Sequence, residues 1–178
     1  MASSDDKIIL AKYLWQRIYQ LGTRSIMGVP GDMKLELLDY VDDANLKWVG
    51  SANELNAAYA ADGYCRVTGA PGVLVTTMGV GKLSALNGVA GAYTEQVKVV
   101  HIVGTTGTSV QQRRAIIYHC LGPNPDHRVY EKISSHVRAA YCWLDDITKA
   151  PRAIDSVLRT CVTRSLPVYI FVPMDFVH

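Results

Sequence analysis

Glu54 is the first candidate for chemistry in this chain of 178 residues, because its carboxylate stands at the start of an alanine-rich helix. Asn53 or Ser51 can cap that helix, which places Glu54 in its first turn. An acid in a first turn often only offsets the helix dipole, and that plain interpretation stays open. The four alanines of 57–61 argue for more, because so little side-chain bulk leaves room for a large group to pack closely.

The loop Gly79-Val80-Gly81 is a candidate for binding a flat ligand, because it lies between an apolar stretch and an expected helix. Glycines before a helix can expose backbone N–H groups to phosphate. The chain nevertheless has neither GxGxxG nor a Walker lysine–serine pair. We therefore interpret these glycines as sites of close backbone approach to a ring.

An alternation of apolar runs and amphipathic segments must position these residues. The expected strands are Ser25–Val29, Lys47–Gly50, Gly72–Thr77, Val97–Val103, Val137–Trp143 and Val168–Val172. The expected helices are Asp5–Leu21 (capped by Ser4 or Asp5), Lys34–Val41, the Glu54 helix up to Gly69, Lys82–Glu95, a short one within Gln111–Cys120, and Ile147–Thr163.

The alternation predicts an α/β fold: a doubly wound, mostly parallel six-stranded sheet with helices on both faces. Ligands of such sheets bind beyond the carboxyl ends of the strands. Three motifs fall at such ends, namely Pro30-Gly31-Asp32, Ser51–Glu54 and the stretch from Thr77 to Gly81. Their convergence predicts a site at that edge of the sheet.

Composition narrows the class of protein. The length fits one domain, 1–178, and a formal charge of +2 favours neither nucleic acid nor a membrane surface as partner. The cysteines have no CxxC spacing and the histidines no metal-binding spacing, so we expect neither disulfides nor a metal site. With no signal-peptide pattern and no apolar run of about 18 residues, the chain is expected to be cytoplasmic.

Several ordered motifs along nearly the whole chain resemble the thiamine diphosphate-dependent 2-oxo acid decarboxylases, of the fungal pyruvate and indolepyruvate decarboxylase type. The motifs are Gly28-Val29-Pro30-Gly31-Asp32, the run 53–64, Thr76-Thr77-Met78-Gly79-Val80-Gly81, Leu83-Ser84-Ala85-Leu86-Asn87-Gly88, His119-Cys120-Leu121-Gly122 and Pro167-Val168-Tyr169. The matching part of that family is its N-terminal pyrimidine-binding domain.

The resemblance implies roles for the candidate residues. Glu54 would contact the aminopyrimidine and relay a proton, in a pocket lined by Pro30, Gly31, Thr77, Gly79 and Val80. Asp32 and His119 would be the polar active-site residues that handle protons. The plain alternatives are a helix-capping Asp32 and a loop histidine bonded to backbone.

Two positions depart from the family pattern. Tyr118 stands where the decarboxylases carry the first of two adjacent histidines, and a phenol does not titrate near neutrality as imidazole does. Lys82 stands where the nearest relatives carry a glutamate beside the glycine loop. Both changes put ordinary decarboxylase activity in doubt.

The family's middle and diphosphate-binding domains, with the Gly-Asp-Gly signature for magnesium, have no counterpart in this sequence. The leading hypothesis is therefore the aminopyrimidine-binding half of a 2-oxo acid decarboxylase, inactive alone on pyruvate. It would form a homo-oligomer or pair with a cofactor-binding domain. Two rivals remain: a repurposed domain with thiamine-independent acid–base catalysis on a small or polyketide-like molecule, and a non-enzymatic binding or regulatory paralogue.

Overall fold

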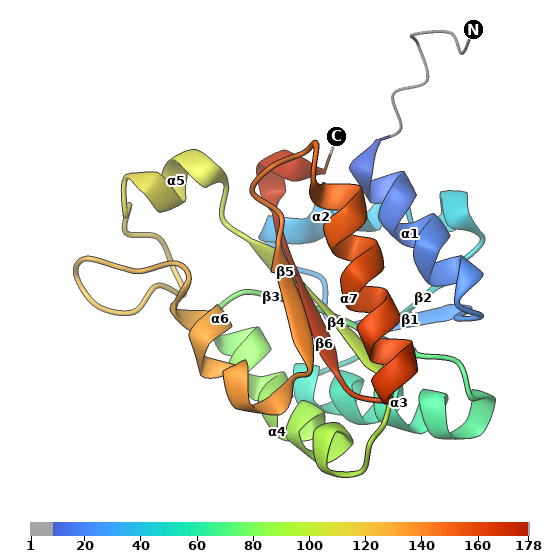
Figure 1. The fold of residues 1–178 in the computed structure, drawn as a ribbon. Coiled ribbons are helices and arrows are strands. Elements are labelled where there is room, and N and C mark those ends of the chain that lie inside the picture. Colours follow the sequence, from blue (N-terminus) through green and yellow to red (C-terminus); the bar gives the residue numbers. More distant parts are fainter. Residues whose placement is uncertain (1–8, 178) are drawn as a thin grey trace, which may run out of the picture.

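The fold is an open sheet of parallel strands covered by helices on both faces, as a computed structural model describes it for residues 9–177 (Figure 1). The strands, in sheet order β2-β1-β3-β4-β6-β5, are β1 (Ser25–Gly28), β2 (Lys47–Gly50), β3 (Gly72–Thr77), β4 (Val99–Thr105), β5 (Ala140–Trp143) and β6 (Val168–Pro173). The helices are α1 (Leu10–Gln20), α2 (Leu35–Leu38), α3 (Glu54–Thr68), α4 (Val80–Thr94), α5 (Thr108–Gln112), α6 (Val129–Ile133) and α7 (Ala150–Arg164). Every strand pair is parallel, so the predicted α/β fold is confirmed.

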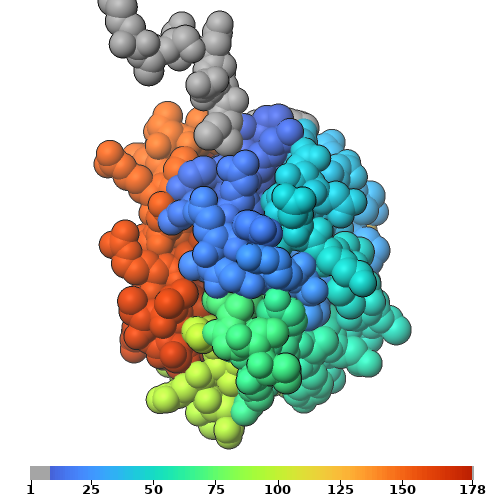
Figure 2. Space-filling view, turned by 90° about the vertical axis from the view of Figure 1, so that its right-hand side faces the viewer, coloured from blue at the N-terminus to red at the C-terminus, as the bar shows by residue number. Residues whose placement is uncertain are grey.

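Two apolar cores lie on opposite faces of the sheet. Helices α1, α2 and α7 pack on one face, around Trp15 and Ile102. Helices α3, α4 and α6 pack on the other, around Leu74 and Phe171. Strands β3, β4 and β6 are buried along their whole length, as expected for β-branched runs covered on both sides. Figure 2 shows one side of the molecule, on which segments of the N-terminal half, coloured blue to green, reach the surface.

The helix that carries Glu54 has well-defined ends. Asn53 caps α3 by accepting a hydrogen bond from the Leu55 N–H at 2.7 Å. Gly69 ends it in the left-handed region at φ 75°. The sequence predicted both ends correctly, which fixes Glu54 as the first residue of the helix.

Several predicted bounds are wrong, mostly where polar turns replace regular structure. The expected Lys34–Val41 helix is a 3-10 turn (Asp32–Lys34) followed by the short α2. The helix expected within Gln111–Cys120 is α5, which begins and ends earlier, and left-handed Arg114 (φ 50°) lies just beyond it. Helix α7 starts later than predicted, because the Asp146 carboxylate first accepts the Thr148 N–H in a turn. Helix α6 was not predicted, and the caps proposed for the first helix lie outside the described residues.

Helix α3 and strand β3 approach each other at Gly72. A Cβ atom on Gly72 would lie 1.9 Å from the backbone oxygen of Ala61 in α3. Only a residue without a side chain fits there, because the obstacle is backbone and cannot rotate away.

None of the helices in the described part of the chain is long and apolar enough to cross a membrane.

Candidate functional site

The carboxyl ends of β1, β2 and β3 bring the three predicted motifs together. Gly28 at the end of β1 is in register with Gly50 of β2 and with Val75 of β3. Thr77 at the end of β3 is in register with Gly104 of β4. The loops that follow these strands therefore emerge at the same edge of the sheet, as predicted.

The Glu54 carboxylate lies directly against Gly81 at the start of α4. A Cβ atom on Gly81 would lie 2.5 Å from Glu54 Oε1. Glu54 is half-buried, and no hydrogen bond joins its carboxylate to another described residue. The absence of a side chain at Gly81 thus leaves the space that the Glu54 carboxylate occupies. The carboxylate keeps its hydrogen-bonding capacity for a ligand.

Asp32, Tyr118 and His119 form a second polar group beside the glycine loop. The Tyr118 hydroxyl donates to Asp32 Oδ2 at 2.9 Å, which raises the pKa of Tyr118 above its ordinary value. The Tyr118 and His119 rings contact each other with centroids 4.1 Å apart. His119 in turn lies against Gly79, where a Cβ atom would be 2.5 Å from that of His119. Gly79 has φ 86° and His119 has φ 71°, so both backbones take the left-handed region at this contact.

Two further hydrogen bonds hold the loop of His119 against α4. The Tyr130 hydroxyl donates to the His119 carbonyl oxygen. The Lys82 ammonium donates to the Tyr130 carbonyl oxygen. A chain of contacts therefore runs from α4 through α6 to the loop that carries Tyr118.

The remaining predicted pocket residues flank the same edge. Gly31 lies against Thr77, with a Cβ atom on Gly31 falling 3.2 Å from that of Thr77. The Thr77 hydroxyl is buried and has no partner among residues 9–177. Pro30 is exposed and Val80 is 60% exposed, so this part of the edge faces solvent.

The structure thus places every predicted site residue at one edge of the sheet. It joins them in pairs: Glu54 with Gly81, Asp32 with Tyr118, His119 with Gly79, and Gly31 with Thr77. No hydrogen bond links Glu54 to the Asp32–Tyr118 pair within the described chain. The chemical roles of these residues remain predictions.

Two buried lysines are the unusual electrostatic feature of this edge. Lys34 is 2% exposed and Lys82 is fully buried, and burial lowers the pKa of each to about 7. The charge of Glu54 partly counteracts that shift for Lys34. Sequence reasoning missed Lys34, although its spacing from the buried Leu37 and Val41 is that of an inward helix face.

His101 of β4 is a core residue with only one of its two ring nitrogens paired among the described residues. It is fully buried, and its Nε2 lies 2.9 Å from the Thr76 hydroxyl. Its Nδ1 has no partner among the described residues. Burial, with further effects of Lys82 and Lys34, keeps the pKa of His101 well below its ordinary value, so the ring is neutral.

The lysines predict a specific pH dependence of stability. Their pKa is about 7 in the folded protein and about 10.4 in an unfolded chain, so the unfolded chain binds more protons between these values. The free energy of unfolding should therefore rise by about 1–3 kcal/mol from pH 7 to pH 8.5. Urea unfolding at both pH values measures it. In the double variant Lys34→Met/Lys82→Met the rise should disappear, and an unchanged rise would contradict this origin.

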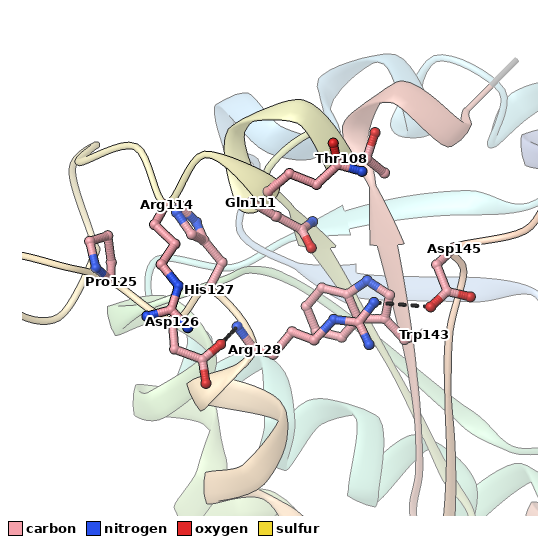
Figure 3. Close-up of a pocket in the computed structure, with 10 residues that line it drawn as sticks. Thr108, Gln111, Arg114, Pro125, Asp126, His127, Arg128, Trp143 and Asp145 are labelled. Atoms are coloured by element: carbon pink, nitrogen blue, oxygen red, sulfur yellow. Dashed lines mark hydrogen bonds and ion pairs between the residues drawn. The ribbon is translucent and has the colours of Figure 1, made fainter.

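A separate hollow of about 300 Å³ lies beyond the ends of β4 and β5 (Figure 3). Its walls include Thr108, Arg114, Arg128 and Trp143. The Arg128 guanidinium lies over the Trp143 ring and bonds Asp145 at 3.0 Å, so this charge is already paired. The hollow contains none of the predicted site residues. Within residues 9–177 no group of three or more His, Cys, Asp or Glu side chains is placed to hold a metal ion, and the four cysteines are unpaired.

The chain is similar to known proteins along most of its length. Residues 9–126 match the family model described as the thiamine pyrophosphate enzyme, N-terminal TPP binding domain. A putative pyruvate decarboxylase of Schizosaccharomyces pombe is 50% identical over 175 residues, covering 97% of this chain and 30% of that protein. Pyruvate decarboxylase of Aspergillus parasiticus is 51% identical over 168 residues, which cover 94% of this chain and 29% of that protein. Pyruvate decarboxylase isozyme 3 of Saccharomyces cerevisiae is 45% identical over 172 residues, which cover 96% of this chain and 30% of that protein. The chain thus spans about 30% of the length of these curated relatives.

Proposed function

This chain belongs to the thiamine pyrophosphate enzymes through their N-terminal TPP binding domain, and we propose that it binds the aminopyrimidine half of thiamine diphosphate in a 2-oxo acid decarboxylase. The observation that carries the proposal is the contact between the Glu54 carboxylate and Gly81. Glu54 is an acid with no hydrogen-bonding partner among residues 9–177, set against the Gly81 backbone at the carboxyl edge of a parallel sheet. Such an acid suits a flat ring that has a nitrogen acceptor.

The residues present fit that group. Gly31 and Gly81 keep the walls of the edge free of side chains, since a Cβ atom would meet Thr77 on one side and Glu54 on the other. The buried Thr77 hydroxyl has no partner in the described part of the chain and can bond an amino or ring nitrogen. The diphosphate and its magnesium would have to be held elsewhere, which agrees with the short share of the relatives' length that this chain covers.

When bound, thiamine diphosphate supplies the carbon nucleophile and the electron sink for loss of carbon dioxide. The Glu54 side chain would orient the ring and hold a proton at its nitrogen. The hydrogen-bonded Tyr118 and Asp32 would hold a second proton next to His119, which lies against Gly79. These residues form the acid–base set of the proposed reaction.

The proposal has consequences for partners. Because the proposal places the diphosphate outside residues 1–178, we infer that these residues pair with a diphosphate-binding domain or assemble as a homo-oligomer. The substrate would be a small 2-oxo acid, and the chain alone would not turn over pyruvate. The unpaired cysteines favour the cytoplasm as its location.

Thermal melting with thiamine tests the proposal. Ligand at 100 times its dissociation constant should stabilise the fold by about 2.7 kcal/mol, and a thiazolium fragment without the aminopyrimidine should not. Gly81→Ala should reduce the shift, because its methyl group would occupy the position beside Glu54 Oε1. Gly91→Ala in the same helix is the matched control, since nothing lies within 4 Å of a Cβ atom there. Equal melting with and without thiamine would overturn the proposal.

A second candidate function rests on the Tyr118–Asp32 hydrogen bond. A phenol whose pKa is raised donates to a carbonyl group without titrating near neutrality. A repurposed domain would use this pair for thiamine-independent acid–base catalysis on a small or polyketide-like molecule. In that case Tyr118→Phe would abolish activity and thiamine would have no effect on melting. A non-enzymatic regulatory paralogue would have no activity for Tyr118→Phe to abolish, and thiamine would not change its melting temperature.

A further inference from the structure

Tyr130 of α6 is buried beside the loop that carries Tyr118 and His119. Its side chain is 2% exposed, and its hydroxyl donates a hydrogen bond to the carbonyl oxygen of His119. A buried tyrosine hydroxyl usually finds a partner, so the bond alone would carry little meaning. The backbone that it binds is special, however. His119 has φ 71°, a region that residues with a side chain seldom adopt unless their surroundings hold them there.

The segment between α5 and α6 contains no helix or strand, so its shape depends on turns and on side-chain contacts. Nearer its start, the His127 Nε2 atom lies 3.1 Å from the Ala115 carbonyl oxygen. The hydrogen bond from Tyr130 holds the segment next to Tyr118, whose ring contacts that of His119 with centroids 4.1 Å apart. Tyr130 therefore anchors the backbone at the point from which the Tyr118 side chain extends.

Lys82, in the first turn of α4, holds Tyr130 in turn. Its ammonium is fully buried and donates to the Tyr130 carbonyl oxygen, which also accepts from the Ser134 hydroxyl at 3.4 Å. A Cβ atom on Gly79, at the start of the same helix, would lie 2.5 Å from that of His119. The backbone of His119 is thus held between the start of α4 and the hydroxyl of Tyr130.

We propose that Tyr130, held in place by Lys82, is a positioning residue that fixes the backbone of His119. The fixed backbone presents the Tyr118 ring to Asp32 and so maintains their hydrogen bond. Because Tyr118 is 56% exposed, water competes for its hydroxyl, and the bond depends on how the backbone presents the ring. The proposal rests on the function given above, in which this pair holds a proton.

The pKa of Tyr118 reports the state of this bond, because the hydrogen bond with Asp32 raises it above its ordinary value. NMR of protein labelled with carbon-13 at the tyrosine Cζ atoms follows each phenol, and Tyr118→Phe identifies the Tyr118 signal. Asp32→Asn gives the pKa of Tyr118 without the carboxylate. We expect Tyr130→Phe to remove about half or more of the shift that Asp32→Asn removes.

The matched control is Tyr64→Phe, which also removes a tyrosine hydroxyl bonded to the backbone, here the Arg24 N–H at 2.8 Å. The pKa of Tyr118 in this variant should equal that in the unmodified chain. Lys82→Met should lower the pKa of Tyr118 by less than Tyr130→Phe does, because Lys82 acts only through Tyr130. Melting shows that each variant is folded.

Nuclear Overhauser effects between the Tyr118 ring protons and the Asp32 β protons provide a second measurement, made at neutral pH. They should weaken in Tyr130→Phe and persist in Tyr64→Phe. An unchanged pKa or unchanged Overhauser effects in Tyr130→Phe would overturn the positioning role. Both measurements are made without thiamine, so failure of thiamine to bind would contradict the proposed function and leave the role of Tyr130 standing.

Discussion

Replacing Glu54 by glutamine is expected to weaken thiamine binding by about 10- to 100-fold, the effect of losing a hydrogen bond to a charged group. Glutamine keeps the size of the side chain against Gly81, and the Asn53 cap of α3 is untouched. The loss would therefore report the acid itself. Isothermal titration with thiamine measures it.

The matched control is Tyr118→Phe, which removes the hydroxyl bonded to Asp32 and leaves Glu54 in place. Its affinity for thiamine should stay within about twofold of the unmodified chain, since no hydrogen bond links this pair to Glu54 among residues 9–177. In a chimera that carries this chain in place of the N-terminal part of the Aspergillus parasiticus enzyme, Glu54→Ala should slow decarboxylation by about 10²-fold or more. Equal affinity of the Glu54→Gln and Tyr118→Phe variants would refute the assigned role of Glu54.

Gly72→Ala should destabilise the fold by about 3 kcal/mol or more, the upper range for overpacking. The added methyl carbon would meet the Ala61 backbone oxygen at 1.9 Å, so α3 would have to move away from β3. Because α3 begins at Glu54, the movement should also weaken thiamine binding. A fall of roughly 10 °C in the melting temperature is expected for a chain of this length.

Gly91→Ala, also a glycine-to-alanine substitution, is expected to raise the free energy of unfolding instead of lowering it. This glycine lies in α4 with nothing within 4 Å of an added Cβ atom, and alanine is the better helix former. The variant should gain about 0.5–1 kcal/mol in free energy of unfolding. If both alanine variants lost similar stability, the specific contact at Gly72 would not be the cause.

The sequence predicted those elements of the fold that have a regular hydrophobic periodicity. Strand β3 and helix α3 have clear periodicity and end signals, and both were placed within about two residues. The segment between β4 and β5 has no such period, because its conformation depends on distant contacts. The Tyr118–Asp32 hydrogen bond joins residues 86 positions apart. The left-handed His119 is set by its contact with Gly79, which no local pattern reveals.

The candidate site was predictable to the extent that strand ends determine it. Glu54 and the two glycine loops follow buried strands, so their convergence follows from parallel topology. Lys34 was not predicted, because a lysine is normally a surface residue and only its spacing indicated burial. The contact between Glu54 and Gly81 could not be predicted from the sequence, because it depends on the packing of α3 on α4.

The hydrogen bonds from Lys82 to Tyr130 and from Tyr130 to His119 connect α4 and α6 to the loop that carries Tyr118. Gly79 and Lys82 are attached to the same helix, α4, which also packs against the helix of Glu54. A displacement of α6 would therefore pull on the loop of Tyr118 and on the glycine loop at once. A molecule that docked on α6 would thereby change the distance between Glu54 and the Tyr118–Asp32 pair without touching either.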